Sequence, residues 1–160
     1  MIVVSDTSVI SNLLQIRQFS LLEKLFHDVV IPSKVYQELL AFHAPEELAP
    51  LIQSEAVAVK SIADLASFQK FSQAVDEGEA EAIVLALELK ADLLLVDDME
   101  ARQMATGLGI KITGLLGVLL EAKLAGHLAS LAPVLEMLKK KTGFWISDWL
   151  YRKILKDAGE

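Results

Sequence analysis

Short aliphatic runs alternate with stretches of helical pattern along this chain, and the alternation limits the fold more than any other feature of the sequence. Buried strands of parallel sheets read as continuous Val, Ile and Leu because helices cover both of their faces. Repeated strand and helix units of this length are typical of a parallel sheet between two helical layers. Five runs predict strands, at residues 2–5, 28–31, 56–60, 93–96 and 111–113.

The segments between these runs predict helices that would cover the sheet. Helical patterns occupy residues 7–16, 21–27, 34–42, 62–75, 79–90 and 99–106. Residues 43–50 contain two prolines, which predict an interruption of regular structure before a short helix or loop. The remainder is predicted to be helical, with breaks at Gly126, Pro133 and Gly143. We therefore predict an α/β fold, a three-layer α/β/α sandwich with a central, mostly parallel sheet, in a single domain of residues 1–160 that ends in a helical extension, residues 126–160.

Acidic side chains follow two of the predicted strands, where they would be partly withdrawn from water. Asp6 ends the first aliphatic run, and Asp97 and Asp98 end the fourth. Glu79 and Glu81 lie at the start of an alanine-rich predicted helix. In open α/β sheets, the crevice beyond the carboxyl ends of the strands is the usual ligand site. Because carboxylates gathered there would repel one another, we expect a hard divalent cation to join them.

Composition narrows both the compartment and the choice of metal ligands. The chain contains no cysteine, which excludes disulfides, thiolate zinc sites and cysteine nucleophiles. No apolar run approaches the roughly 20 residues of a membrane helix, and the N-terminus lacks the pattern of a signal peptide. We expect a cytoplasmic protein without a membrane partner, whose metal has oxygen ligands only. His27, His43 and His127 fall in no acidic motif, so we interpret them as surface or loop residues.

Charge is divided unevenly along the chain. Residues 1–100 contain 6 Lys and Arg against 17 Asp and Glu, whereas residues 101–160 contain 9 against 5. Two interpretations of the basic end remain open: a solvated helix face beside two core tryptophans, Trp145 and Trp149, or a surface that contacts nucleic-acid phosphates and stacks on bases. The candidates for nucleic-acid binding are Lys139, Lys140, Lys141, Arg152 and Lys153, with Lys34 and Arg102 as weaker ones.

Three common functions of parallel α/β folds do not match this sequence. Residues 6–11 contain no glycine and no Walker lysine, which argues against a dinucleotide-binding or nucleotide-binding loop. Haloacid-dehalogenase-like phosphatases usually carry a second aspartate two residues after the first, where this chain has Ser8. Receiver domains carry their aspartate pair after the first strand, whereas the pair Asp97-Asp98 comes late here.

Four motifs surround the acidic residues. They are Val4-Ser5-Asp6-Thr7-Ser8-Val9-Ile10, Val30-Ile31-Pro32-Ser33-Lys34-Val35-Tyr36-Gln37-Glu38-Leu39, Gly78-Glu79-Ala80-Glu81-Ala82-Ile83 and Leu94-Leu95-Val96-Asp97-Asp98. Together, and in this order, they resemble the PIN-domain family of metal-dependent ribonucleases, of which VapC-type toxins are the best-known small members. The resemblance extends from residue 1 to about residue 125, and the tail from Gly143 is similar to that of a compact prokaryotic subgroup.

The resemblance implies which acids form the site. Four residues match the four family acids, which act as catalytic residues and hold the metal. They are Asp6, Glu38, Glu81 and Asp98. Glu79 and Asp97 remain open as alternative or additional ligands, because two glutamates stand where the toxins usually have one aspartate, and two aspartates follow the fourth strand. Ser8 matches a small polar position that supports the first acid.

The same resemblance implies the reaction. Oxygen ligands favour Mg²⁺ or Mn²⁺, which would activate a water for attack on phosphorus. We predict an endoribonuclease that hydrolyses RNA phosphodiester bonds, with the toxin of a toxin–antitoxin pair as a candidate role, an antitoxin as a partner and a homodimer as the expected assembly. The alternative is a non-catalytic PIN-like protein that binds a second copy or another partner through residues 115–125 and the aromatic tail.

Overall fold

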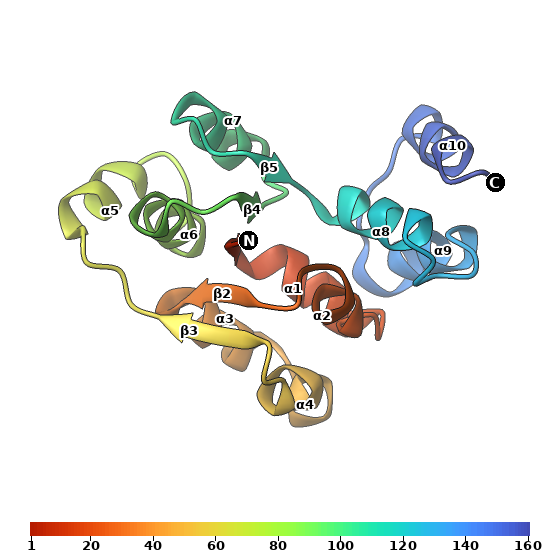
Figure 1. The fold of residues 1–160 in the computed structure, drawn as a ribbon, viewed down its shortest axis with the longest axis horizontal. Helices are drawn as coiled ribbons and strands as arrows, with labels where there is room; N and C mark the ends of the chain where they lie inside the picture. The colour runs from red at the N-terminus through yellow and green to blue at the C-terminus, as the bar shows by residue number, and fades with distance from the viewer.

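Five parallel strands form the centre of the protein, in a computed structural model that describes residues 1–160. The strands lie in the order β3-β2-β1-β4-β5 (Figure 1). The expected α/β/α sandwich is therefore confirmed, and its sheet is wholly parallel. The strands are β1 (Val3–Ser5), β2 (Val29–Pro32), β3 (Val57–Lys60), β4 (Leu93–Leu95) and β5 (Ile112–Thr113).

Ten helices cover the two faces of the sheet. They are α1 (Thr7–Gln15), α2 (Ser20–Phe26), α3 (Ser33–Phe42), α4 (Pro45–Gln53), α5 (Leu65–Phe71), α6 (Glu77–Leu89), α7 (Met99–Gly107), α8 (Leu115–Leu124), α9 (Ala132–Thr142) and α10 (Asp148–Asp157). Figure 1 shows α5, α6 and α7 on one side of the sheet, and α1, α2, α8 and α9 on the other. None of these helices is both long enough and apolar enough to cross a membrane.

Alternate residues of each strand face opposite helical layers, which explains the continuous aliphatic runs. Val4 pairs with Leu94, and both lie in a buried cluster with side chains of α5, α6 and α7. Val3 pairs with Leu93, and both lie in a larger cluster on the opposite face. Because helices cover both faces of the sheet, successive residues of these strands are all buried, and apolar side chains are favoured at each of them.

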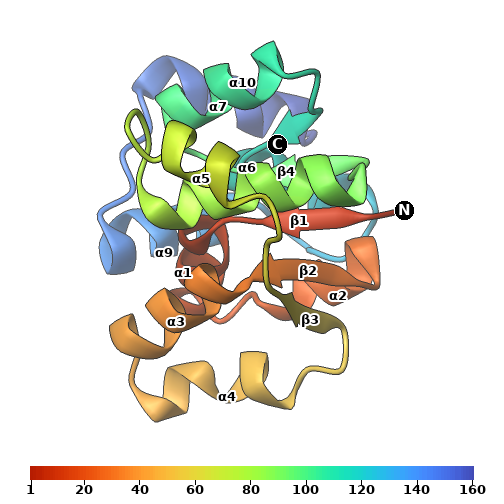
Figure 2. The same ribbon diagram turned by 90° about the vertical axis from the view of Figure 1, so that its left-hand side faces the viewer.

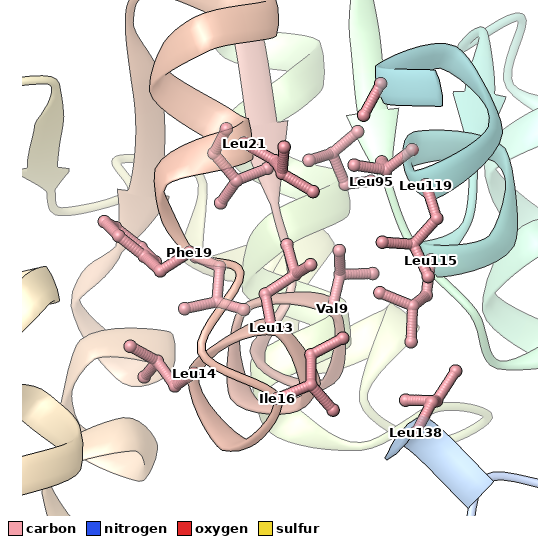
Figure 3. Close-up of a cluster of buried hydrophobic side chains, with 14 of the residues drawn as sticks. Val9, Leu13, Leu14, Ile16, Phe19, Leu21, Leu95, Leu115, Leu119 and Leu138 are labelled. Carbon is pink, nitrogen blue, oxygen red and sulfur yellow. The ribbon is translucent and has the colours of Figure 1, made fainter. Parts of the chain in front are cut away.

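The larger cluster joins the N-terminal helices to the C-terminal ones. Figure 3 shows Leu13 of α1 near the centre of this cluster, with Leu115 and Leu119 of α8 on one side. Leu138 of α9 and Ile154 of α10 belong to the same cluster. The helices after residue 126 therefore share the core of the sheet, which orders α9 and α10 against the rest of the chain.

Helix α4 is the main departure from the predicted elements. The two prolines predicted an interruption over residues 43–50, but Pro45 begins a helix that continues through Pro50. Proline is well tolerated at a first helical position, where its missing N–H would have no partner in any case. Glu46 and Glu47 in the first turn complement the helix dipole. Burial of Leu48 in the larger cluster then stabilises the short helix.

The order of the strands places a crevice between β1 and β4. The chain moves from β1 to β2 and β3 in one direction, then returns to add β4 and β5 on the other side of β1. At such a switch point, the connections leave the sheet in opposite directions and open a crevice at the carboxyl ends of the strands. In Figure 2, β1 runs from the N-terminus towards the start of α1, which is the edge that carries this crevice.

Candidate functional site

A cavity of about 470 Å³ opens at this edge of the sheet. Six of its ten lining residues are acids, and they come from four separate parts of the chain. The lining residues are Asp6, Thr7, Ser8, Ser11, Glu38, Phe42, Asp76, Glu79, Asp97 and Asp98. The fold thus gathers acidic residues that are up to 92 positions apart, with one hydrophobic residue among them.

Asp6 is the most buried acid of the cavity. It is 1% exposed, and as the N-cap of α1 its Oδ1 accepts a hydrogen bond from the Val9 N–H at 3.1 Å. The Ser8 hydroxyl donates to the other carboxylate oxygen at 3.1 Å. Burial raises the pKa of Asp6 to about 7, although these two hydrogen bonds oppose the rise. A negative charge on Asp6 is therefore costly unless a cation lies nearby.

Glu38 reaches the cavity through close contacts with two small residues. The Thr7 hydroxyl donates a hydrogen bond to Glu38 Oε2 at 2.8 Å, which fixes the carboxylate beside Asp6. A Cβ atom on Gly78 would lie 2.6 Å from Glu38 Oε1. The carboxylate therefore fits against the start of α6 only because residue 78 has no side chain. An exposed helical glutamate, the ordinary interpretation of such a residue, is ruled out by these contacts.

Asp97 carries a buried oxygen that has no partner in the protein. Its Oδ1 accepts a hydrogen bond from the Leu115 N–H at 3.0 Å, but Oδ2 is buried without any hydrogen bond. Burial raises the pKa of Asp97, and the Leu115 hydrogen bond and the charge of Arg102 counteract part of that rise. Buried polar atoms nearly always have partners, so an unpaired carboxylate oxygen at an acidic cavity indicates a ligand position.

Asp98 is held more loosely than its neighbour. It is exposed, and as the N-cap of α7 its Oδ2 accepts a hydrogen bond from the Ala101 N–H at 3.0 Å. Both aspartates therefore line the cavity, but only Asp97 is withdrawn from water.

The two glutamates of the third motif point to different places. Glu79 lines the cavity, and its Oε1 accepts a hydrogen bond from the Asp76 N–H at 3.2 Å in a reciprocal capping box. Burial raises the pKa of Glu79 to about 8, and its interactions with Asp76 add to the rise. Glu81 does not line the cavity, because its Oε1 accepts a hydrogen bond from the Lys34 N–H at 3.2 Å, at the start of α3.

The carboxylates share one cavity without closing around a single point. No group of three or more His, Asp and Glu side chains is close enough to hold a metal ion. Asp6, Asp98 and Glu79 are each held instead by a hydroxyl or backbone N–H at the start of their own helix. Glu38 and Asp97 are held by groups at the starts of other helices. The donor set still fits a hard divalent cation, because it consists of oxygens alone and includes the unpaired Asp97 Oδ2.

Several cavity residues were not predicted from the sequence. Thr7 and Gly78 position Glu38, while Asp76 caps the helix that carries Glu79. The order Asp76-Glu77-Gly78-Glu79 does contain the capping-box pattern, in which an N-cap acid is followed three residues later by a glutamate. Phe42 had no detectable signal, since a phenylalanine at the end of a predicted helix is ordinarily a core residue.

We expect Gly114→Ala to destabilise the protein through Asp97. A Cβ on Gly114 would overlap Asp97 Oδ1 and lie 2.8 Å from Arg102 Nη1, so the buried carboxylate would have to move. Overpacking of this kind typically costs about 1 to 3 kcal/mol. Urea denaturation measures the loss. Gly107→Ala is the matched control, because a Cβ there meets no atom within 4 Å; equal stability of the two variants would contradict the prediction.

The predicted basic residues form a separate surface. Lys139, Lys140, Lys141, Arg152 and Lys153 are exposed on α9 and α10, and none of them lines the acidic cavity. Figure 2 shows α9 at the end of the molecule towards which β1 runs. The weaker candidates are engaged elsewhere. Lys34 Nζ lies 2.9 Å from Glu77 Oε2, and Arg102 donates a hydrogen bond to the Val96 carbonyl.

Trp145 and Trp149 are not core residues, so this part of the first interpretation of the basic end is wrong. Trp145 is 82% exposed and Trp149 is 68% exposed. The core positions near them are taken by Ile146 and Ile154 instead. Trp149 lies at the start of α10 and lines a groove together with Leu150 and Ile154, so its large apolar surface remains available to a ligand or partner.

A comparison with models of protein families identifies the family of this chain. A family model described as a PIN domain matches residues 2–160. The chain belongs to the PIN-domain family. PIN domains are typically metal-dependent nucleases that act on RNA, so the acidic cavity lies on a nuclease fold. A comparison with curated proteins gives no match. The predicted resemblance to the PIN-domain family is therefore confirmed, and its match extends beyond residue 125 to the end of α10.

Proposed function

We propose that this PIN domain is a divalent-metal-dependent ribonuclease that hydrolyses RNA phosphodiester bonds at the acidic cavity. The observation that carries the proposal is the unpaired, buried Asp97 Oδ2 in the same cavity as the buried Asp6. Two withdrawn carboxylates are unfavourable neighbours in the free protein, and a shared cation would reverse that penalty.

The cavity also favours a definite set of ligands. Asp6, Glu38, Glu79 and Asp97 would hold Mg²⁺ or Mn²⁺ directly or through water, with Asp98 as a further ligand at the exposed side. When bound, the cation would supply an activated water and stabilise charge on the phosphate. Among the family acids matched from the sequence, Glu81 is replaced by Glu79 in this proposal, because Glu81 binds the start of α3.

Mn²⁺ binding by calorimetry and cleavage of single-stranded RNA in the same buffers would test this proposal. We expect Glu79→Gln to weaken Mn²⁺ binding about tenfold or more, since neutralising a ligand removes a charge-assisted contact. Glu81→Gln is the matched control, with the same change two residues away, and should bind Mn²⁺ as the wild type does. The reverse result would return the third ligand position to Glu81.

The exposed basic residues of α9 are the proposed RNA-binding surface. We expect the joint change of Lys139, Lys140 and Lys141 to alanine to weaken RNA binding and flatten its salt dependence. Each lost phosphate contact should reduce the slope of log affinity against log salt by about 0.7 for a single strand. Joint replacement of Lys24, Lys60 and Lys70 by alanine is the matched control, because these exposed lysines carry the same total charge at other places on the surface. If both triple variants weaken RNA binding equally, α9 does not carry a specific RNA-binding surface.

A second function is favoured by the apolar surface of α8 and α10. A groove of about 270 Å³ between them is lined by Leu116, Leu120, Leu150 and Ile154, beside the exposed Trp149. Such a surface fits a second copy of the chain or an antitoxin, as the predicted homodimer and toxin–antitoxin role require. Wild-type protein that neither binds Mn²⁺ nor cleaves RNA would favour this non-catalytic function over the nuclease.

A further inference from the structure

A buried histidine connects the acidic cavity to a second cavity. His43 lies in the short connection between α3 and α4, as a loop position expected from the sequence would have it, but at 8% exposed it is not a surface residue. Its Nε2 lies 2.7 Å from Ser11 Oγ of α1. Its Nδ1 lies 2.6 Å from Glu47 Oε1 of α4. Side chains of α1 and α4 thus meet at a ring in the connection between α3 and α4.

The hydrogen bonds of this ring have a defined direction. A carboxylate has no hydrogen to donate, so Nδ1 donates to Glu47. When the ring is neutral, Nε2 accepts the hydroxyl hydrogen of Ser11. When the ring is protonated, Nε2 donates to Ser11 Oγ instead, and the Ser11 hydroxyl hydrogen is free to point elsewhere. The Glu47 carboxylate holds the orientation of the ring through Nδ1.

The two hydrogen-bond partners of the His43 ring line different cavities. Ser11 lines the acidic cavity together with Asp6 and Glu38. Glu47 lines a second cavity of about 460 Å³, together with Arg17 and Lys141. A polar ring that faces a hydroxyl of the proposed active site therefore indicates a chemical role.

We propose that Ser11, His43 and Glu47 form a relay that gives a proton to the leaving oxygen of the cleaved phosphodiester. The inference rests on the nuclease function proposed above. As the P–O bond breaks, its electron pair stays on the leaving oxygen, which takes the hydroxyl proton of Ser11. Ser11 Oγ takes the proton of His43 Nε2 at the same time, and the ring becomes neutral.

The proton balance of this step closes within one turnover. The attacking water loses one proton to solvent as it bonds to phosphorus, and the His43 ring takes one proton from solvent before the next turnover, so protons lost and gained are equal. No oxidant, reductant or other reactant is needed. Ser11 is the catalytic residue of the relay, because its hydroxyl lines the cavity and, in this proposal, gives its proton to the leaving oxygen. His43 and Glu47 are positioning residues that act through it.

A substrate that needs no leaving-group proton separates this role from a structural one. The products of wild-type cleavage first identify the leaving oxygen. The same RNA is then prepared with sulfur at that bridging position, because a thiolate leaves without protonation. We expect Ser11→Ala to slow cleavage of the oxygen substrate at least tenfold and to leave cleavage of the sulfur substrate within about twofold of wild type, since general acid catalysis typically contributes 10²–10⁴-fold.

Two further variants keep the test independent of folding. His43→Gln should give the same substrate-dependent loss as Ser11→Ala, provided that its circular dichroism melt matches that of the wild type. Ser8→Ala is the control, because Ser8 lines the same cavity but bonds Asp6, and it should slow both substrates equally. Equal slowing of both substrates by Ser11→Ala would overturn the relay alone. A wild type that cleaves neither substrate would overturn the nuclease function and the relay with it.

Discussion

Asp6→Asn is expected to abolish metal-dependent RNA cleavage and, in the same protein, to raise the stability of the metal-free fold. The amide keeps the shape of the carboxylate and can still accept from the Val9 N–H, while Ser8 can accept a hydrogen bond from its NH₂ group. What the change removes is the buried charge. The cation proposed for this cavity would lose its most buried ligand, so cleavage and Mn²⁺ binding should both fall below detection.

The gain in stability follows from the raised pKa of Asp6. Burial moves this pKa from 3.8 to about 7 on folding, so the unfolded chain releases the proton more readily than the folded protein. Between these two values the folded state therefore loses stability as pH rises. Since one unit of pKa difference is worth about 1.4 kcal/mol, we expect Asp6→Asn to gain about 2 to 4 kcal/mol at pH 8. The gain should shrink to about 1 to 2 kcal/mol at pH 5.

Urea denaturation in the presence of a chelator, at both pH values, measures this difference. Asp98→Asn is the control, because Asp98 lines the same cavity but is exposed, and its stability should stay within about 0.5 kcal/mol of wild type. A gain from Asp6→Asn that is the same at pH 5 and pH 8 would mean that burial does not raise this pKa. Destabilisation at both pH values would mean that the carboxylate is needed as a helix cap.

The layers of the fold could be predicted from the sequence, because strands and helices are indicated by residues that are neighbours in the chain. The strands are short, mostly continuous aliphatic runs, and the five predicted strands match the five observed within one or two residues. Asp6 and Asp98 were likewise predictable, because an acid that directly follows a buried strand must lie at the edge of the sheet. Such positions depend only on neighbours in the chain.

The direction of a side chain from a helix start was not predictable in the same way. Glu79 and Glu81 differ by two positions, which places them about 200° apart around a helix. Only the placement of α6 against α3 decides that Glu79 faces the cavity and Glu81 faces the Lys34 N–H. The contact between His43 and Ser11 is a similar case, because these residues are 32 positions apart, whereas Glu47 is only four positions from His43. Tertiary packing, which no local pattern encodes, determines both.

Gly78→Ala is expected to lower RNA cleavage about 100-fold although it adds a better helix former. Alanine in a helix is worth up to about 1 kcal/mol over glycine, but the new Cβ would lie 2.6 Å from Glu38 Oε1 and 2.9 Å from Oε2. The carboxylate must then swing away and lose its hydrogen bond from Thr7. Displacement of a site group by about 1 Å can cost about 100-fold in rate. Steady-state cleavage of single-stranded RNA measures the loss.

A double-mutant cycle separates this contact from a general effect on α6. In a Glu38→Ala background the side chain that meets the new Cβ is gone, so Gly78→Ala should be neutral or stabilising there by up to about 1 kcal/mol. In the wild-type background the same change should destabilise the protein by about 1 to 3 kcal/mol. If Gly78→Ala has the same effect in both backgrounds, residue 78 does not position Glu38. A coupling of the expected sign would mean that the absence of a side chain at residue 78 keeps the second acid of the cavity beside Asp6.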